Sequence, residues 1–139
     1  MIVIDASVGF KWLNQESHHQ QALQLLQLHL ENTHQILVPS LFFLEIANAL
    51  VTKTSTTPTT VKKNLNLINS FNLKIHSFTK ADLLLSTHLA QKHHTTIYDM
   101  LYAVIAKANH TDLVTADTNF LHKTHFRHVK LLQDLPLLR

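Results

Sequence analysis

The sequence contains no cysteine and only one glycine among its 139 residues. Without cysteine, the chain can form neither a disulfide nor a thiolate metal site. With one glycine, it cannot build the glycine-rich loops that hold the phosphates of dinucleotides or nucleoside triphosphates. It also lacks an apolar run near the roughly 20 residues that span a bilayer. Residues 1–5 lack the basic flank and cleavage site of a signal peptide. We therefore expect a cytoplasmic protein with no membrane contact.

Acidic residues are also scarce, with nine Asp and Glu against twelve Lys and Arg and a net charge of +3. If several of these acids gather in one cleft, the rest of the surface is more basic than the total suggests. A basic surface around an acidic pocket suits a polyanionic partner. A mildly basic protein with no such partner fits the charge alone equally well.

Short apolar, β-branched runs alternate with amphipathic stretches along the whole chain. The runs predict strands at 2–4, 36–38, 73–76, 113–115 and 129–132. The amphipathic stretches predict helices from residue 6, over 16–31, 40–51, 61–71, 79 to about 92, 96–108 and 117–122, with a polar loop at 52–60. This alternation predicts an α/β fold in which a parallel sheet carries helices on both faces. The length and the 45% hydrophobic content fit one domain, residues 1–139.

Four acids stand where a parallel α/β sheet brings side chains together. Asp5 and Asp117 follow predicted strands, Asp99 lies in a first helical turn, and Glu45 lies about a turn and a half into the helix after the second strand. Ligands of open parallel sheets bind at the carboxyl ends of the strands, and helix side chains tilt towards the helix N-terminus. We therefore expect these four side chains to meet at one edge of the sheet.

Each acid also has a purely structural interpretation. Asp5 and Asp117 suit helix N-caps, and Thr96-x-x-Asp99 is a capping-box pattern. Glu45 is harder to explain in this way, because it lies among apolar residues and the nearest base, Lys53, is eight positions on. Buried acids are almost always paired, so a shared cation is the simplest partner.

The repulsion between gathered carboxylates supports a cation. Two of them about 4 Å apart repel by roughly 4 kcal/mol at an effective dielectric of 20. The repulsion among four carboxylates would offset a large part of the roughly 5–15 kcal/mol that stabilises a domain. Because oxygen ligands suit hard ions, the sequence predicts Mg²⁺ or Mn²⁺.

The segments around these acids resemble one family. They are Val3-Ile4-Asp5-Ala6-Ser7, Glu45-Ile46-Ala47-Asn48-Ala49-Leu50, Tyr98-Asp99-Met100-Leu101-Tyr102-Ala103 and Val114-Thr115-Ala116-Asp117-x-x-Phe120. In this order and spacing they are similar to the PIN-domain nucleases, and most of all to the VapC-type toxins of bacterial toxin–antitoxin pairs. The resemblance implies a three-layer α/β/α sandwich with about five parallel strands. It also implies a Mg²⁺- or Mn²⁺-dependent endoribonuclease acting on structured RNA, a small antitoxin partner and a homodimer.

Matched by position, the resemblance makes Asp5, Glu45, Asp99 and Asp117 the metal-binding and catalytic acids. Ser7, Thr115 and Asn48 match polar positions that support the site. Asn119 stands where the family often has a further acid, so we expect one tightly held ion rather than two. Candidate RNA contacts are Lys11, His122, Lys123 and Arg127.

Other interpretations stay open at the level of sequence. Asp5-x-Ser7 is also similar to the start of a metal-dependent adhesion site, which would make the protein a non-catalytic binding module. An aspartyl-phosphate receiver or phosphatase also has acids near the first strand, but the last predicted strand holds Lys130 within it rather than after it. A housekeeping PIN ribonuclease without an antitoxin is a further alternative.

Overall fold

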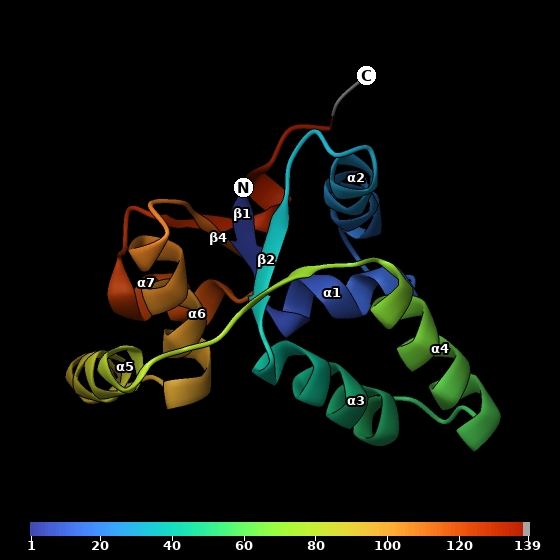
Figure 1. Cartoon of the computed structure of the whole chain (residues 1–139), viewed down its shortest axis with the longest axis horizontal. Coiled ribbons are helices and arrows are strands. Elements are labelled where there is room, and N and C mark those ends of the chain that lie inside the picture. Colours follow the sequence, from blue (N-terminus) through green and yellow to red (C-terminus); the bar gives the residue numbers. More distant parts are fainter. Residues whose placement is uncertain (138–139) are drawn as a thin grey trace.

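The computed structural model describes residues 1–137 and contains a five-stranded parallel sheet between helices (Figure 1). The elements in chain order are β1 (Ile2–Ile4), α1 (Ala6–Leu13), α2 (His19–Leu30), β2 (Ile36–Pro39), α3 (Leu41–Lys53), α4 (Pro58–Ser70), β3 (Lys74–His76), α5 (Lys80–His93), α6 (Ile97–Ala108), β4 (Leu113–Thr115), α7 (Thr118–Thr124) and β5 (Val129–Leu131). A short 3₁₀ turn, Leu132–Asp134, follows β5.

The strands lie in the order β3-β2-β1-β4-β5, and every neighbouring pair is parallel. The central strand β1 places Val3 opposite Leu37 of β2 on one side and opposite Leu113 of β4 on the other. All residues of β2 and β4 are buried, as expected for strands that are covered on both faces. The predicted α/β fold with about five parallel strands is therefore confirmed.

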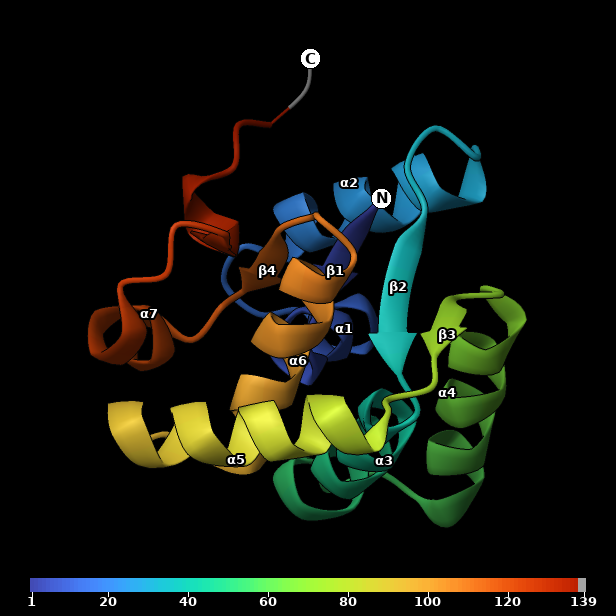
Figure 2. The same cartoon turned by 60° about the vertical axis from the view of Figure 1, so that its left-hand side comes forward.

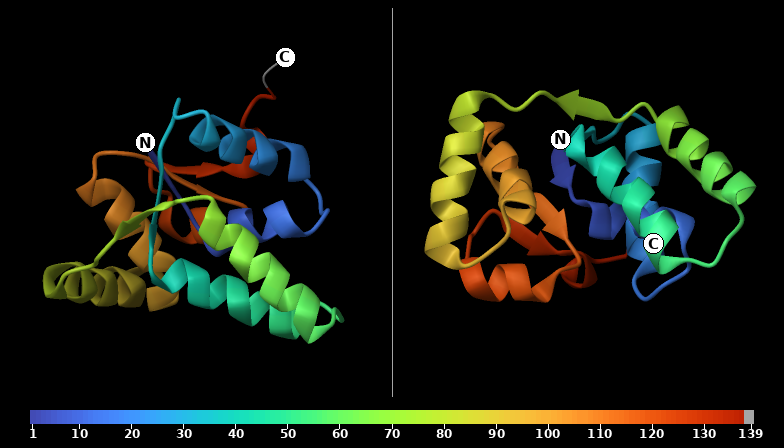
Figure 3. Two further views of the ribbon diagram at one scale, coloured as in Figure 1. Left: turned by 45° about the vertical axis from the view of Figure 1, so that its right-hand side comes forward. Right: turned by 90° about the horizontal axis from the view of Figure 1, so that it is seen from below.

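Two helical layers enclose this sheet. Helices α1 to α4 lie on one face and α5 to α7 on the other (Figures 2 and 3). The chain builds outwards from β1 through β2 to β3, and then returns across the sheet to β4. The direction of strand addition thus reverses between β1 and β4. This is the switch point at which open parallel sheets bind their ligands.

The hydrophobic core joins the sheet to both helical layers. The sole glycine, Gly9, marks the closest approach of α1 to α3, because a Cβ atom there would stand 2.5 Å from two ring atoms of Phe42. Close contact at this point holds α3, and with it Glu45, against the start of the chain. Among residues 1–137, no helix combines the length and the apolar character needed to cross a membrane.

Two predicted helix starts were wrong. Helix α2 begins at His19 rather than at residue 16, because Glu16 and Ser17 instead bind the Lys11 ammonium group. Helix α4 begins at Pro58, inside the predicted polar loop, with the Thr57 side chain accepting the Thr60 N–H. Proline is favourable at a first helical position, where no N–H is needed.

Ser40, the predicted first residue of the helix over 40–51, directly precedes α3. Its backbone is already helical, and within the described chain its hydroxyl makes no capping hydrogen bond.

Candidate active site

A cavity of about 700 Å³ opens at the carboxyl ends of β1 and β4, over the switch point. All four predicted acids, Asp5, Glu45, Asp99 and Asp117, line it. They come from four separate places: the end of β1, the middle of α3, the first turn of α6 and the start of α7. The structure therefore brings together residues that are up to 112 positions apart, as the strand and helix positions predict.

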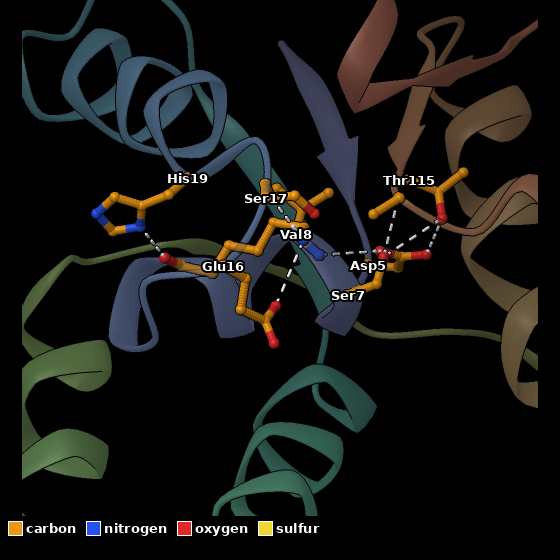
Figure 4. A network of polar contacts seen from close by, with 9 residues as sticks. Asp5, Ser7, Val8, Glu16, Ser17, His19 and Thr115 are labelled. Carbon is orange, nitrogen blue, oxygen red and sulfur yellow. Dashed lines mark hydrogen bonds and ion pairs between the residues drawn. The ribbon is translucent and has the colours of Figure 1, made fainter. Parts of the chain in front are cut away.

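Asp5 is held by two hydroxyl groups (Figure 4). Ser7 Oγ donates to Oδ1 and Thr115 Oγ1 donates to Oδ2, each over 2.5 Å. The hydroxyl oxygens in turn accept the backbone N–H groups of Ala116 and Asp117, both over 3.0 Å. The loops that follow β1 and β4 are thus tied together through this carboxylate, and both of its oxygens are fixed in direction.

The surroundings of Asp5 favour its protonated form. Its pKa is raised from the ordinary 3.8 to about 6, because burial, together with the negative charge of Asp99, outweighs the Ser7 and Thr115 hydroxyls, which lower it. Asp5 also accepts the Val8 N–H over 3.3 Å and so caps α1. The capping role and the place in the cavity are therefore compatible.

Glu45 is only partly buried, and it has a protein partner in addition to the cation that the sequence predicts. Its partner is Tyr102 of α6, whose hydroxyl donates to Glu45 Oε1 over 2.6 Å. Burial raises the pKa of Glu45 and the charge of Asp99 adds to this, while the Tyr102 hydrogen bond and the charge of Lys53 lower it. Tyr102 is 1% exposed, and burial with three nearby acids raises its pKa well above the ordinary value. It therefore keeps its proton and acts as a donor.

Asp99 and Asp117 complete the acidic wall. Burial raises the pKa of Asp99, and the charge of Asp117 raises it further, while Thr96 and Lys123 lower it. The Thr96 hydroxyl accepts the Asp99 N–H over 3.1 Å, but within residues 1–137 the Asp99 carboxylate does not complete the capping box. Asp117 caps α7 by accepting the Phe120 N–H over 3.2 Å. Of the three acids at helix starts, Asp99 is therefore the one that a capping role explains least.

Lys11 lies on the cavity wall and is 7% exposed. Its Nζ donates to the carbonyl oxygen of Ser17 over 2.9 Å and contacts Glu16 Oε1 at 3.4 Å (Figure 4). The side chain of His19 contacts the Lys11 carbonyl oxygen at 2.6 Å. A cation is thereby fixed beside the acids by the loop between α1 and α2.

The other predicted residues divide into two groups. Ser7 and Asn48 line the cavity, and Thr115 contacts it through Asp5. Asn119 and His122 are exposed and lie outside the cavity lining. The exposed Lys123 donates to the carbonyl oxygen of His94, and its positive charge lowers the pKa of Asp99.

Arg127 is not brought to the acids. It comes just before β5, so it lies at the amino-terminal end of the strands, whereas the acids lie beyond their carboxyl ends.

Two residues of the cavity were missed by the sequence interpretation. Tyr102 lies three residues after Asp99, one helical turn along, a spacing that places both on one face of α6. Lys53 was dismissed as too distant in sequence from Glu45, yet it lines the same cavity. Helical spacing offered a signal for Tyr102, but its contact with α3 depends on how the helices pack.

Comparison with known proteins agrees with this geometry. The family model described as the PIN domain matches residues 2–125. This chain belongs to the PIN domain family. Proteins of the family are nucleases, and they generally use divalent metal ions. No curated protein matches the chain.

Solved structures share the PIN fold with this chain. The crystal structure of PAE2754 from Pyrobaculum aerophilum has a TM-score of 0.68 at 21% identity, and the match covers 95% of this chain and 90% of that one. VapBC2 from Rickettsia felis, bound to a DNA fragment from its promoter, gives a TM-score of 0.70 at 19% identity, over 94% of this chain and 98% of that one.

The donor set of this PIN domain fits a hard divalent cation. Its carboxylates raise one another's pKa across the cavity, so a positive ion among them would remove that repulsion. In the described part of the chain, no three His, Asp or Glu side chains come close enough to enclose a metal ion. Mg²⁺ does not require such a cage, because it keeps several waters and binds through one or two carboxylates together with substrate phosphates.

Proposed function

We propose that this PIN domain is a Mg²⁺- or Mn²⁺-dependent endoribonuclease that hydrolyses structured RNA. The observation that carries the proposal is the cavity at the switch point, which is lined by Asp5, Glu45, Asp99 and Asp117. The charge of Asp99 raises the pKa of Asp5 and Glu45, and the charge of Asp117 raises that of Asp99. A binding role without a metal ion would not explain why carboxylates that repel one another are gathered in one cavity. Membership of a nuclease family supports the same conclusion.

The acids would divide the chemistry between them. A bound divalent cation lowers the pKa of a coordinated water and polarises the scissile phosphate. Asp5, whose two oxygens are aimed by Ser7 and Thr115, and Asp99 are the residues best placed to hold it. Asp99 or Asp117 would orient the attacking water or accept its proton. In-line attack would then leave a 5′-phosphate and a 3′-hydroxyl.

Three lysines place positive charge around the acids. Lys11 and Lys53 line the cavity, and Lys123 lies beside the turn that precedes α6. An acidic centre alone would repel RNA, whereas flanking cations attract its phosphates and set the register of the strand. The exposed Lys53 and Lys123 are the expected contacts for the phosphates on either side of the cleaved bond, whereas the buried Lys11 contributes only its charge.

We further propose that the protein is the toxin of a toxin–antitoxin pair. The likeness to VapBC2 over 94% of this chain supports this assignment. The antitoxin partner and the homodimer remain predictions. Growth arrest on expression, relieved by a small protein encoded beside this one, would distinguish a toxin from a housekeeping ribonuclease. An absence of growth arrest would contradict the toxin assignment and leave the nuclease assignment standing.

Cleavage of a structured RNA tests the nuclease assignment. We expect cleavage with Mg²⁺ or Mn²⁺, none with EDTA, and none with the Asp5→Asn variant. The matched control is Asp134→Asn, which neutralises an exposed acid outside the cavity and should cleave like the wild type. Full activity in EDTA, products with a 2′,3′-cyclic phosphate, or a folded Asp5→Asn variant with wild-type activity would each contradict the mechanism.

A further inference from the structure

A second cavity, of about 520 Å³, lies at the opposite end of the sheet. It is formed where α6 runs into β4 and α7 runs into β5, since Leu113 and Val129 begin paired strands. Four exposed basic side chains line it, and we call it the basic pocket: Lys107, His110, His125 and Arg127. One acid, Asp112, lies among them. None of these residues takes part in the acidic site.

The four exposed basic side chains of this pocket have no partners among the residues that the structure describes. All four are exposed, and within residues 1–137 none of their side chains makes a hydrogen bond or an ion pair. The wall behind them is held by contacts between side chains and with the backbone. His128 contacts the Ala103 carbonyl oxygen at 2.8 Å and stacks on Phe126, with ring centroids 5.4 Å apart. Exposed basic side chains that line one cavity and have no partner in the described chain are suited to bind an anion.

The residue types favour a phosphate group. The planar guanidinium of Arg127 matches the oxygens of a phosphate with two parallel hydrogen bonds, and the ammonium group of Lys107 adds a point charge. The single carboxylate, Asp112, is outnumbered by these two permanent cations.

Helix α7 links the two cavities. Asp117 caps its first turn and lines the acidic cavity, while His125 caps its last turn and lines the basic pocket. With seven residues, α7 is only about 10 Å long. Lys123, in its last turn, adds a further exposed cation on the way. A single RNA strand can therefore reach from one cavity to the other within a few nucleotides.

We propose that the basic pocket is an RNA subsite, which binds a backbone phosphate a few nucleotides from the bond cleaved in the acidic cavity. This inference rests on the proposed ribonuclease function, and it adds to that function a contact outside the catalytic cavity. The pocket fixes the position of the RNA and takes no part in the chemistry. Removing its positive charges should therefore weaken the binding of RNA more than it slows the cleavage of bound RNA.

The test is the double variant Lys107→Ala/Arg127→Ala, compared with Lys62→Ala/Lys63→Ala. The control removes the same two charges from exposed positions on α4. On a long structured RNA we expect the KM of the first variant to rise roughly tenfold with little change in kcat, and the slope of log Kd against log salt to fall by about 1 to 2. The control should match the wild type.

A short oligonucleotide that fills only the acidic cavity provides the second measurement. Its KM should be the same for wild type and both variants, because it does not extend to the basic pocket. Equal losses for both double variants on the long RNA, or none for Lys107→Ala/Arg127→Ala, would overturn the inference. So would a loss confined to binding of a protein partner. If the wild type itself cleaves no RNA, the proposed function fails, which is a separate result.

Discussion

Replacing Asp5 with asparagine is expected to stabilise the ion-free protein at neutral pH while abolishing its activity. Burial raises the pKa of Asp5 from the ordinary 3.8 to about 6. Between these values the folded state binds more protons than the unfolded state, so the free energy of unfolding falls as pH rises through that range. At 1.36 kcal/mol per pKa unit, the loss above pH 6 is about 3 kcal/mol.

The asparagine variant avoids this loss but has a cost of its own. An asparagine side chain has only one acceptor oxygen, so it cannot accept hydrogen bonds from Ser7 and Thr115 in the way that Asp5 does. One net hydrogen bond is worth about 0.5–1.5 kcal/mol. We therefore expect Asp5→Asn to be more stable than the wild type by about 2 kcal/mol at pH 7.5. At pH 4 this advantage should be lost or slightly reversed, because Asp5 is then protonated in the folded state and only about half ionised in the unfolded state.

Urea unfolding followed by circular dichroism, in EDTA at pH 4 and pH 7.5, measures both differences. The comparison between variants matters because burial also raises the pKa of Glu45 and Asp99, whereas hydrogen bonds from Thr79 and His76 outweigh burial and lower that of Asp82. These other groups are common to both proteins. An Asp5→Asn variant that is less stable than the wild type at both pH values would refute the reasoning. Asp134→Asn should show no such pH-dependent difference.

Three further predictions concern the same cavity. Tyr102→Phe removes the 2.6 Å hydrogen bond to the partly exposed Glu45, so Mn²⁺ affinity measured by calorimetry should fall about fivefold; unchanged affinity would rule out a positioning role for the hydroxyl. Gly9→Ala places a Cβ atom 2.5 Å from Phe42 ring atoms and should lower the free energy of unfolding in urea by about 1–3 kcal/mol; a neutral result would contradict the close contact of α1 with α3. Mg²⁺ should raise the wild-type Tm more at pH 7.5 than at pH 5, because protons compete for Asp5 below its pKa of about 6; an equal rise at both values would contradict this competition.

The positions of the strands and the convergence of the acids could be predicted because both depend on local patterns. Buried parallel strands are continuous β-branched runs, and Asp5 and Asp117 come immediately or almost immediately after such runs. Chain topology then carries them to one edge. The capping patterns, which competed with the functional interpretation, proved compatible with it, since Asp5 and Asp117 cap helices and line the cavity together.

What could not be predicted depends on packing between helices. Tyr102 contacts Glu45 across 57 positions of sequence, and no spacing rule links α3 to α6. The same is true of the basic pocket, where Lys107 and Arg127 come together only because β4 and β5 are paired. The start of α4 was missed for a local reason, because Pro58 was assigned to a polar loop although proline favours a first helical turn.

The central claim, that the cavity lined by the four acids binds one divalent cation, is tested most directly by titrating the purified protein with Mn²⁺. Electron paramagnetic resonance counts the bound ions. We predict one ion per chain for the wild type and for Asp134→Asn. Binding should be at least roughly tenfold weaker for Asp99→Asn, because losing a carboxylate ligand typically costs more than a neutral hydrogen bond. Wild-type affinity in Asp99→Asn, or no bound ion in the wild type, would contradict the claim.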